Sequence, residues 1–456
     1  MTPTPSALSP EFLHSLCDEY KKYNHIDTAL YNNNNVKRGL RNADGTGVVA
    51  GLTNIGNVHG YIIDEGDIVP VPGKLYYRGI DLEQLVNGFL SEDRFGFEET
   101  SYLLLFGHLP TEAQLKTFND TLAEMRYLPE FFTEDQILRA PSPNIMNKMA
   151  RATLGLYTYD ENPDDTSIEN MMRQGMELIA RFPMILAHAY QAKRHFYDKS
   201  SLHIHFPKGN QSTAESILRT IRSDKKYTME EAKLLDLCLV LHAEHGGGNN
   251  SAFACRVLSS SGTDTYAAIS AALGSLKGPL HGGANAKVIA MFEDIRANVR
   301  DWKDEDEVMN YLKKMINKEV GDHSGKIYGM GHAVYTLSDP RAVILKKNAR
   351  ALAEANGRGD ELNLMELVEK LAPTALAQAK GGKKKICANV DLYSGFVYET
   401  LGIPQELYTP LFAAARIAGW IAHRMEEVTT NARIMRPAYK SVCPVEGSVP
   451  RKERVE

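Results

Sequence analysis

The chain has 456 residues, of which 43% are hydrophobic and 24% are charged, and its formal net charge is −5 at pH 7. This length is enough for about two or three domains, each with a core of its own. The negative charge and the absence of a long Lys/Arg tract argue against a nucleic-acid-binding surface.

The cysteines and the N-terminal sequence indicate the compartment. The five cysteines are odd in number, lie far apart and form no CxxC pair, which favours a reducing compartment without disulfides or thiolate metal sites. The first twenty residues contain no Lys or Arg and lead into no apolar run, so they do not resemble a secretory signal or a mitochondrial presequence. The most apolar stretch near the C-terminus contains Arg416 and His423, which argues against a membrane span. We therefore expect a cytoplasmic protein.

Residues 46–80 are predicted to form short strands and turns. Glycines recur there among β-branched and aromatic residues, as in Val48-Val-Ala and His59-Gly-Tyr-Ile-Ile63. After Asp81 the apolar pattern becomes helical. Because strands do not alternate with helices along the rest of the chain, we predict a mainly α-helical fold and not a doubly wound sheet.

Capping signals mark the starts of several helices. Ser212 and Thr228 are each followed three residues later by Glu, the spacing of a capping box. Asp339-Pro340 supplies an N-cap followed by Pro at the first helical position, and Gly357 is a plausible end of that helix. The apolar run from about 229 to 245 predicts a long helix that ends at Gly246.

Four short stretches next to glycines each present one titratable side chain. They are residues 241–249, 278–285, 329–334 and 389–395, and the side chains are His245, His281, His332 and Asp391. A lone His is more often a satisfied core or surface residue. Three histidines and an aspartate, each beside glycines that allow close approach of a ligand, together indicate an active site.

His245 is expected in the last turn of its helix, where exposed carbonyls favour a protonated imidazole that suits a carboxylate ligand. His242 lies one turn earlier and has a structural interpretation. The two histidines are also compatible with half of a zinc site, but no third ligand is near in the sequence. We therefore expect no metal.

His281 and Asp391 have the properties of an acid and base pair. His281 precedes a predicted helix, whose positive end disfavours the imidazolium and leaves a neutral ring that can polarise a carbonyl. A core histidine at a domain junction is the alternative. Asp391 is a candidate base, because a carboxylate in a closed site has its pKa raised by desolvation. Its motif is equally compatible with a helix N-cap.

Two arginines are candidate anion ligands. Arg341 follows Asp339-Pro340 at the start of a helix, where an arginine is less favourable than an acid, so a purely structural role is disfavoured. Arg416 lies inside the apolar run 411–420 and must be paired if it is buried, either by a ligand or by the protein.

The order His245, His281, His332 and Asp391 with these flanks, followed by Arg416 in an apolar helix, resembles the citrate synthase family. The resemblance covers about residues 46–440. It implies a mainly α, two-domain helical fold with a few short N-terminal strands at about 46–80. The large domain would comprise residues 1–281 and 397–456, and the small domain residues 282–396.

The resemblance also implies the chemistry. Acetyl-CoA would condense with oxaloacetate, without a cofactor, and the bound citryl-CoA would then be hydrolysed. Asp391 would be the base, His281 would hold the thioester oxygen, and His332 would polarise the ketone. The oxaloacetate ligands would be His245, His332, Arg341, Arg416 and Arg436. Arg436 would reach the partner's site in a homodimer.

Coenzyme A contacts are harder to place from the sequence. The run Lys383, Lys384, Lys385 upstream of Asp391 is a candidate for binding the phosphates, and a solvated charge run is the alternative. The resemblance implies that the backbone of the turn Ile327, Tyr328, Gly329, Met330, Gly331 holds the adenine. Thr336 stands where some relatives carry an arginine, so we expect a different distribution of phosphate contacts.

Three alternatives remain open. A 2-methylcitrate synthase would use propionyl-CoA, and one methylene is worth only about 1–3 kcal/mol of discrimination, so the motifs do not decide between the two acyl groups. A non-catalytic acyl-CoA-binding sensor is disfavoured by the intact His281, His332 and Asp391. A zinc hydrolase is disfavoured because no third ligand accompanies His242 and His245. No membrane or nucleic-acid partner is expected.

Overall fold

The computed structural model describes residues 9–209, 211–380, 386–430 and 433–454. The chain divides into two compact units. The first unit consists of Met1–Leu52 and Arg436–Glu456, and the second consists of Thr53–Met435. All predicted site residues except Arg436 therefore belong to the second unit.

The first unit contains short helices and extended segments. Its elements are α1 (Pro10–Tyr23), α2 (Ala29–Asn33), η1 (Arg38–Leu40) and η5 (Arg451–Glu453). Helix α1 begins where the Ser9 hydroxyl accepts a hydrogen bond from the Phe12 amide at 3.2 Å. The Lys440 ammonium donates to the Asn34 side-chain oxygen at 2.7 Å and so links the C-terminal segment to the N-terminal one.

The second unit begins with a small antiparallel sheet in the order β1-β2-β3. Its strands are β1 (Gly56–Asp64), β2 (Asp67–Tyr77) and β3 (Ile80–Asp81). The pairing of β1 with β2 shifts register between His59 and Tyr61. The prediction of strands at 46–80 is therefore right for residues 56–81. It is wrong for Val48-Val-Ala, which forms no strand. The pairing there is limited to an isolated bridge between Arg41 and Gly47, and Val49 is 85% exposed, so little apolar surface is buried to extend it.

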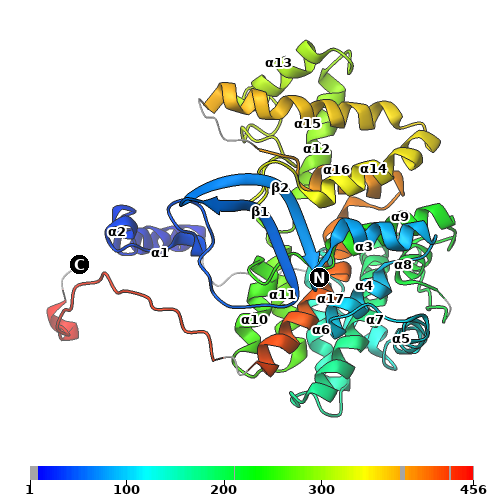
Figure 1. Ribbon diagram of the computed structural model, residues 1–456. Helices are drawn as coiled ribbons and strands as arrows, with labels where there is room; N and C mark the ends of the chain where they lie inside the picture. The colour runs from blue at the N-terminus through cyan, green and yellow to red at the C-terminus, as the bar shows by residue number, and fades with distance from the viewer. Residues whose placement is uncertain (1–8, 210, 381–385, 431–432, 455–456) are drawn as a thin grey trace. The chain divides into compact units, whose positions relative to one another are not determined.

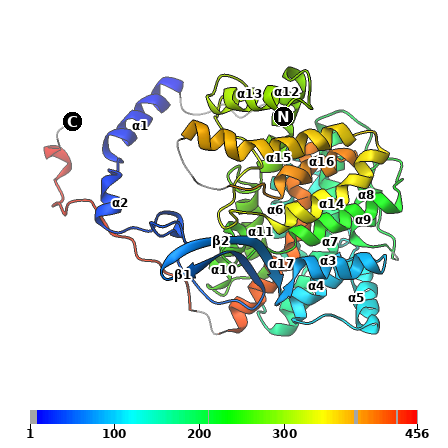
Figure 2. The same ribbon diagram turned by 45° about the horizontal axis from the view of Figure 1, so that its top comes forward.

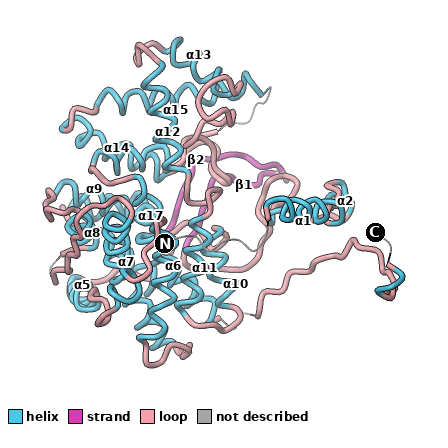
Figure 3. The backbone as a smooth tube through the Cα atoms, turned by 180° about the vertical axis from the view of Figure 1, so that it is seen from behind, coloured by secondary structure: helices cyan, strands magenta, loops and turns pink. Residues whose placement is uncertain are grey.

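The rest of the second unit is helical (Figures 1 and 3), which confirms the predicted fold class. The helices are α3 (Leu82–Ser91), α4 (Phe97–Phe106), α5 (Glu112–Met125), η2 (Thr133–Leu138), α6 (Ile145–Gly155), η3 (Leu156–Tyr159), α7 (Ile168–Phe196), α8 (Thr213–Ile221), α9 (Met229–His242), α10 (Asn250–Ser259), α11 (Thr265–Lys277), α12 (Ala284–Asn298), α13 (Glu305–Ile316), α14 (Pro340–Ala355), α15 (Gly359–Lys380), α16 (Asp391–Thr400), η4 (Gln405–Leu407) and α17 (Tyr408–Thr429).

These helices form two groups. Helix α17 packs against α4, α7, α9, α10 and α11, and its residues from Ala413 to Arg424 are all buried. Helices α12 to α16 pack against one another and gather at the top of Figure 1. Helix α14 contacts α9, α3 and β2, and so it joins the two groups (Figure 2). The assignment of residues 282–396 to a separate small domain stays a prediction.

The capping signals are confirmed where they were predicted. Ser212 with Glu215 and Thr228 with Glu231 form capping boxes at the starts of α8 and α9. The side chain of Asp339 accepts a hydrogen bond from the Arg341 amide at the start of α14. No helix in the described ranges is long and apolar enough to cross a membrane.

Candidate active site

The predicted histidines, Asp391, Arg341 and Arg416 lie in loops and helices of the second unit. His245 follows α9, His281 precedes α12, and His332 lies in the loop before α14. Asp391 is the first residue of α16. Arg341 lies in the first turn of α14 and Arg416 in the middle of α17.

His245 is held against His332 and is a neutral imidazole. The two rings have their centroids 5.1 Å apart at an interplanar angle of 80°. Burial lowers the pKa of His245 well below its ordinary value, and the charges of Arg341 and Arg416 lower it further. The expectation of a cationic His245 is therefore wrong. Helix α9 ends at His242, three residues earlier than predicted, so His245 is not in its last turn.

The tautomer of His332 follows from its hydrogen bonds. Its Nδ1 accepts from the backbone amides of Val334 at 3.0 Å and Tyr335 at 3.1 Å. Backbone amides only donate, so Nδ1 carries the lone pair and the proton of the neutral ring is on Nε2. The ring also stacks on Tyr335, with centroids 4.5 Å apart. His332 therefore presents an oriented N–H donor.

His281 is a neutral donor of the opposite tautomer. Its Nε2 accepts from the Ser251 amide at 3.3 Å and lies 3.1 Å from the Ser251 hydroxyl. The proton of the neutral ring is therefore on Nδ1. Burial lowers the pKa of His281 to about 4, and the charge of Arg416 lowers it as well. Burial and the charge of Arg416 therefore explain the predicted neutral state of His281, and the positive end of α12 is not required to explain it.

The surroundings of Asp391 make its carboxylate a stronger base. Burial raises the pKa of its side chain to about 6, with Asp339 adding to this effect and Arg341 and Arg416 opposing it. Its backbone amide donates to the Asn389 side chain at 3.0 Å. Asp391 is therefore mostly ionised at neutral pH, and it is a better proton acceptor than an exposed aspartate.

Hydrogen bonds tie the His332 loop to the start of α16. The Gly331 amide donates to the Cys387 carbonyl at 2.7 Å, and the Asn389 amide donates to the Gly329 carbonyl at 2.9 Å. The Asn389 side chain donates to the Gly331 carbonyl at 2.9 Å. The turn 327–331, which was predicted to hold adenine, thereby fixes His332 relative to Asp391. Lys383, Lys384 and Lys385 lie outside the described residues.

Arg341 has a protein partner. Its guanidinium is buried and donates from Nε and Nη2 to the two oxygens of Asp339, at 3.1 and 2.8 Å. Although burial opposes it, Asp339 holds the pKa of Arg341 above its usual value. Asp339 was predicted only as an N-cap, and its second role was missed. That Arg341 binds a substrate stays a prediction.

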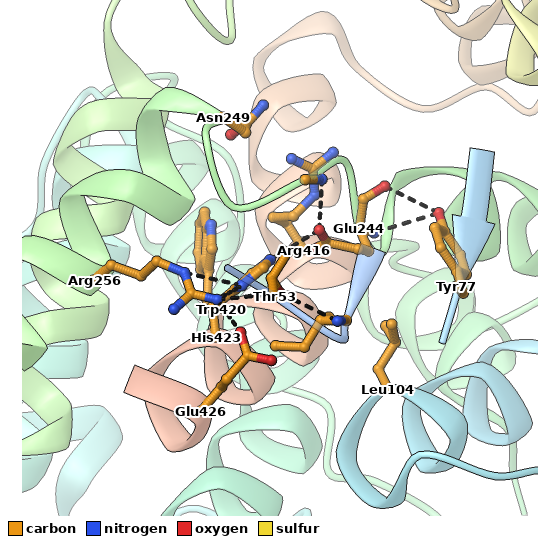
Figure 4. A network of polar contacts seen from close by, with 12 residues as sticks. Thr53, Tyr77, Leu104, Glu244, Asn249, Arg256, Arg416, Trp420, His423 and Glu426 are labelled. Carbon is orange, nitrogen blue, oxygen red and sulfur yellow. Dashed lines mark hydrogen bonds and ion pairs between the residues drawn. The ribbon is translucent and has the colours of Figure 1, made fainter. Parts of the chain in front are cut away.

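Arg416 is fully buried and only partly satisfied (Figure 4). Its Nε donates to the His242 carbonyl at 2.5 Å, and its guanidinium lies 4.7 Å from the centroid of the Phe412 ring. Neither Nη1 nor Nη2 has a hydrogen-bond partner among the described residues, and the buried Nε2 of His245 lacks one as well. Burial lowers the pKa of Arg416 to about 10. A buried cation with two unsatisfied nitrogens is suited to an anionic ligand.

His242 and Arg436 are two further candidates from the sequence. His242 is buried with its ring stacked on Phe412, which fits its structural interpretation. Arg436 is exposed and belongs to the first unit, so its predicted role stays a prediction. Glu244 and Ser251 contact the site region but were missed, although Glu244 stands inside the first glycine-flanked motif. Within the described ranges, no group of three His, Cys, Asp or Glu side chains is arranged to hold a metal ion.

Comparisons with known proteins agree over most of the chain. The model of the citrate synthase C-terminal domain family matches residues 43–438. A citrate synthase from Acidithiobacillus ferridurans is 36% identical over 399 residues, which are 86% of this chain and 92% of the relative. The 2-methylcitrate synthase 1 of Corynebacterium glutamicum is 32% identical over 419 residues, 89% of this chain and 96% of the relative.

A solved structure shows the same fold. It is the ternary complex of the Thermoplasma acidophilum citrate synthase with carboxymethyl coenzyme A and oxaloacetate. It aligns with a TM-score of 0.74 at 27% identity and covers 92% of this chain and 99% of that one. The similarity thus extends over nearly the full length of both chains.

Proposed function

The chain belongs to the citrate synthase family, and from this membership and the geometry of its site we propose that it condenses acetyl-CoA with oxaloacetate and hydrolyses the resulting thioester to citrate and CoA. The observation that supports the substrate best is the buried guanidinium of Arg416. Among the described residues, neither of its two Nη atoms has a hydrogen-bond partner, and the buried Nε2 of the neutral His245 has none either. A dicarboxylate supplies acceptors for all three nitrogens.

The first step is enolisation of the thioester. The carboxylate of Asp391 takes a proton from the methyl group of acetyl-CoA and becomes a neutral acid. The Nδ1–H of His281 donates to the thioester oxygen, where negative charge develops, and so stabilises the enol or enolate. A neutral histidine suits this task because its pKa, lowered to about 4, keeps it uncharged at working pH.

The second step forms the carbon–carbon bond. The enol carbon attacks the ketone carbon of oxaloacetate, and the Nε2–H of His332 stabilises the charge that develops on the ketone oxygen by a hydrogen bond. That oxygen becomes a hydroxyl by taking up one proton, which balances the proton that Asp391 removed from the methyl group, and Asp391 and His332 return to their starting states. The carboxylates of oxaloacetate are held by His245, Arg341 and Arg416, and by the partner subunit's Arg436. Water then adds to the thioester carbonyl of citryl-CoA, the carbon–sulfur bond breaks, and CoA leaves as a thiol.

We further propose a cytoplasmic homodimer in which Arg436 completes the partner's site. All five cysteines are free, which is consistent with a reducing compartment. The reaction uses acetyl-CoA as a substrate and requires no cofactor. The CoA phosphates are assigned to Lys383, Lys384 and Lys385, and the adenine to the turn 327–331.

The choice of acyl group is tested by steady-state kinetics. Thiol release is measured with acetyl-CoA or propionyl-CoA while oxaloacetate is saturating. We expect a higher kcat/KM with acetyl-CoA. A preference for propionyl-CoA would make the protein a 2-methylcitrate synthase, which the similarity to the Corynebacterium glutamicum enzyme keeps as the second candidate. Binding of both compounds without thiol release would indicate an acyl-CoA sensor.

A further inference from the structure

A chain of buried polar groups leads from the His245 turn to the end of α17 (Figure 4). Oε1 of Glu244 lies 2.8 Å from Nε2 of His423. Nδ1 of His423 lies 2.7 Å from Nη2 of Arg256. Arg256 in turn forms ion pairs with Glu426 and, at 2.7 Å, with Glu427. Glu244 and His423 are both completely buried.

The chain of hydrogen bonds has a fixed direction. A guanidinium only donates, so Nδ1 of His423 must accept from Arg256 and the proton of the neutral ring is on Nε2. His423 therefore donates to the Glu244 carboxylate. Burial alone would raise the pKa of Glu244, but its electrostatic interaction and hydrogen bond with His423, together with the charge of Arg416, hold that pKa below its usual value. Glu244 is thus a buried, ionised acceptor.

Hydrogen bonds to Glu244 hold the backbone before and after His245. Its Oε1 also accepts from the Gly246 amide at 2.5 Å, and its backbone carbonyl accepts from the Tyr77 hydroxyl at 3.1 Å. The carboxylate fits only because two glycines flank it. A Cβ on Gly56 would lie 2.8 Å from Oε1, and one on Gly419 would lie 2.6 Å from Oε2.

We propose that Glu244 and His423 are positioning residues that fix the His245 turn relative to α17, the helix that carries Arg416. His423 and Arg416 are seven residues apart on α17, close to two helical turns, so they project from one face. The inference rests on the proposed function, in which His245 and Arg416 bind the same oxaloacetate molecule. Neither Glu244 nor His423 needs to touch the substrate for this role.

The test uses matched variants of His423. His423→Phe removes both hydrogen bonds. His423→Asn keeps an acceptor near Arg256 but is too short to reach Glu244, whereas His423→Gln is long enough to donate to Glu244. We expect His423→Phe and His423→Asn to raise the Kd of oxaloacetate at least about 10-fold, because a displacement of about 1 Å in a binding group has large effects. His423→Gln should recover most of the affinity.

The readouts separate positioning from general damage. Oxaloacetate Kd is measured by calorimetry, and KM for each substrate and kcat by thiol release. The KM of oxaloacetate should rise while the KM of acetyl-CoA at saturating oxaloacetate stays near wild type. Arg424→Met is the control, because Arg424 is the next residue on α17 and is equally buried, but it bonds to Ser259, Thr263 and Thr265 instead. It should lower stability without raising the KM of oxaloacetate.

Two results would overturn the inference. One is wild-type affinity for oxaloacetate in His423→Asn, and the other is an equal loss of affinity in Arg424→Met. If His423→Phe does not fold, the Asn and Gln variants decide, since only the Asn variant should lose affinity. A wild-type enzyme that binds oxaloacetate but releases no thiol would refute the proposed reaction and leave the binding comparison intact.

Discussion

Asp339 and Arg341 form a buried ion pair in which both carboxylate oxygens accept from the guanidinium, at 3.1 and 2.8 Å. The same carboxylate accepts from the Val390 amide at 3.2 Å, one residue before Asp391. Asp339 therefore joins the start of α14 to the start of α16. Asp339, the N-cap of α14, thus also fixes the position of the proposed base Asp391 relative to the proposed substrate ligand Arg341.

Replacing Asp391 with Asn should stop proton abstraction while leaving oxaloacetate bound. The amide keeps the size of the side chain but accepts no proton, so turnover should fall at least about 100-fold. Oxaloacetate Kd, measured by calorimetry, should stay near wild type. Because the raised pKa of Asp391 shows that the fold disfavours its charge, the uncharged amide should make the variant unfold at a higher temperature at pH 7. Turnover near the wild-type value would remove Asp391 from the role of base.

The pH profile should report the same carboxyl group. Its pKa is raised to about 6, so kcat/KM for acetyl-CoA should fall tenfold per pH unit below about pH 6, as the base becomes protonated. His281 does not interfere, because its pKa is lowered to about 4. The profile is measured with oxaloacetate saturating in buffers of constant ionic strength. A rate that is flat from pH 5 to pH 7 would contradict the assignment.

Local sequence predicted the parts of the site that local structure determines. The motif before α12 placed His281 at a helix start, and Asp339-Pro340 predicted the cap of α14. The charge of His245 was predicted wrongly because it depends on the burial of the ring and on the charges of Arg341 and Arg416, and both arise only from the fold. The hydrogen bond between Glu244 and His423 joins residues 179 positions apart, and no local pattern encodes it.

Removal of metal should not affect the reaction. The three proposed histidines act as hydrogen-bond donors, and the described part of the chain groups no three metal-ligating side chains. Activity should therefore survive prolonged dialysis against EDTA. Loss of activity that added zinc restores would instead favour a hydrolase with His242 and His245 as ligands.

Arg416 should lower the stability of the ligand-free protein and be essential for binding oxaloacetate. Replacement by Met removes a buried cation that has two nitrogens without a partner in the described part of the chain, so the ligand-free variant should be at least as stable as wild type in urea. Its affinity for oxaloacetate should fall at least about 100-fold, since truncating one partner of a buried charge pair costs about 2–5 kcal/mol. Arg424→Met is the matched control on the same helix. A large loss of stability without loss of affinity would show that Arg416 is structural.

Oxaloacetate should bind first and create the acetyl-CoA site. Its proposed ligands come from both helix groups, with His245 and Arg416 on the group around α17, and His332 and Arg341 with the group of α12 to α16. A ligand that contacts both groups stabilises the arrangement in which they lie closest, through contacts that other arrangements lack. Scattering or Trp fluorescence should therefore report compaction with oxaloacetate alone.

The binding energies must then be coupled in both directions. Oxaloacetate should raise the affinity for a non-reactive acetyl-CoA analogue, and the analogue must raise the affinity for oxaloacetate by the same factor, because coupling free energy is reciprocal. Closure would also keep water from the thioester until the condensation is complete. Calorimetric titrations are made in both orders to measure the two factors. Equal affinities with and without the second ligand would rule out ordered closure, although the roles of Asp391, His281 and His332 in condensation would be unaffected.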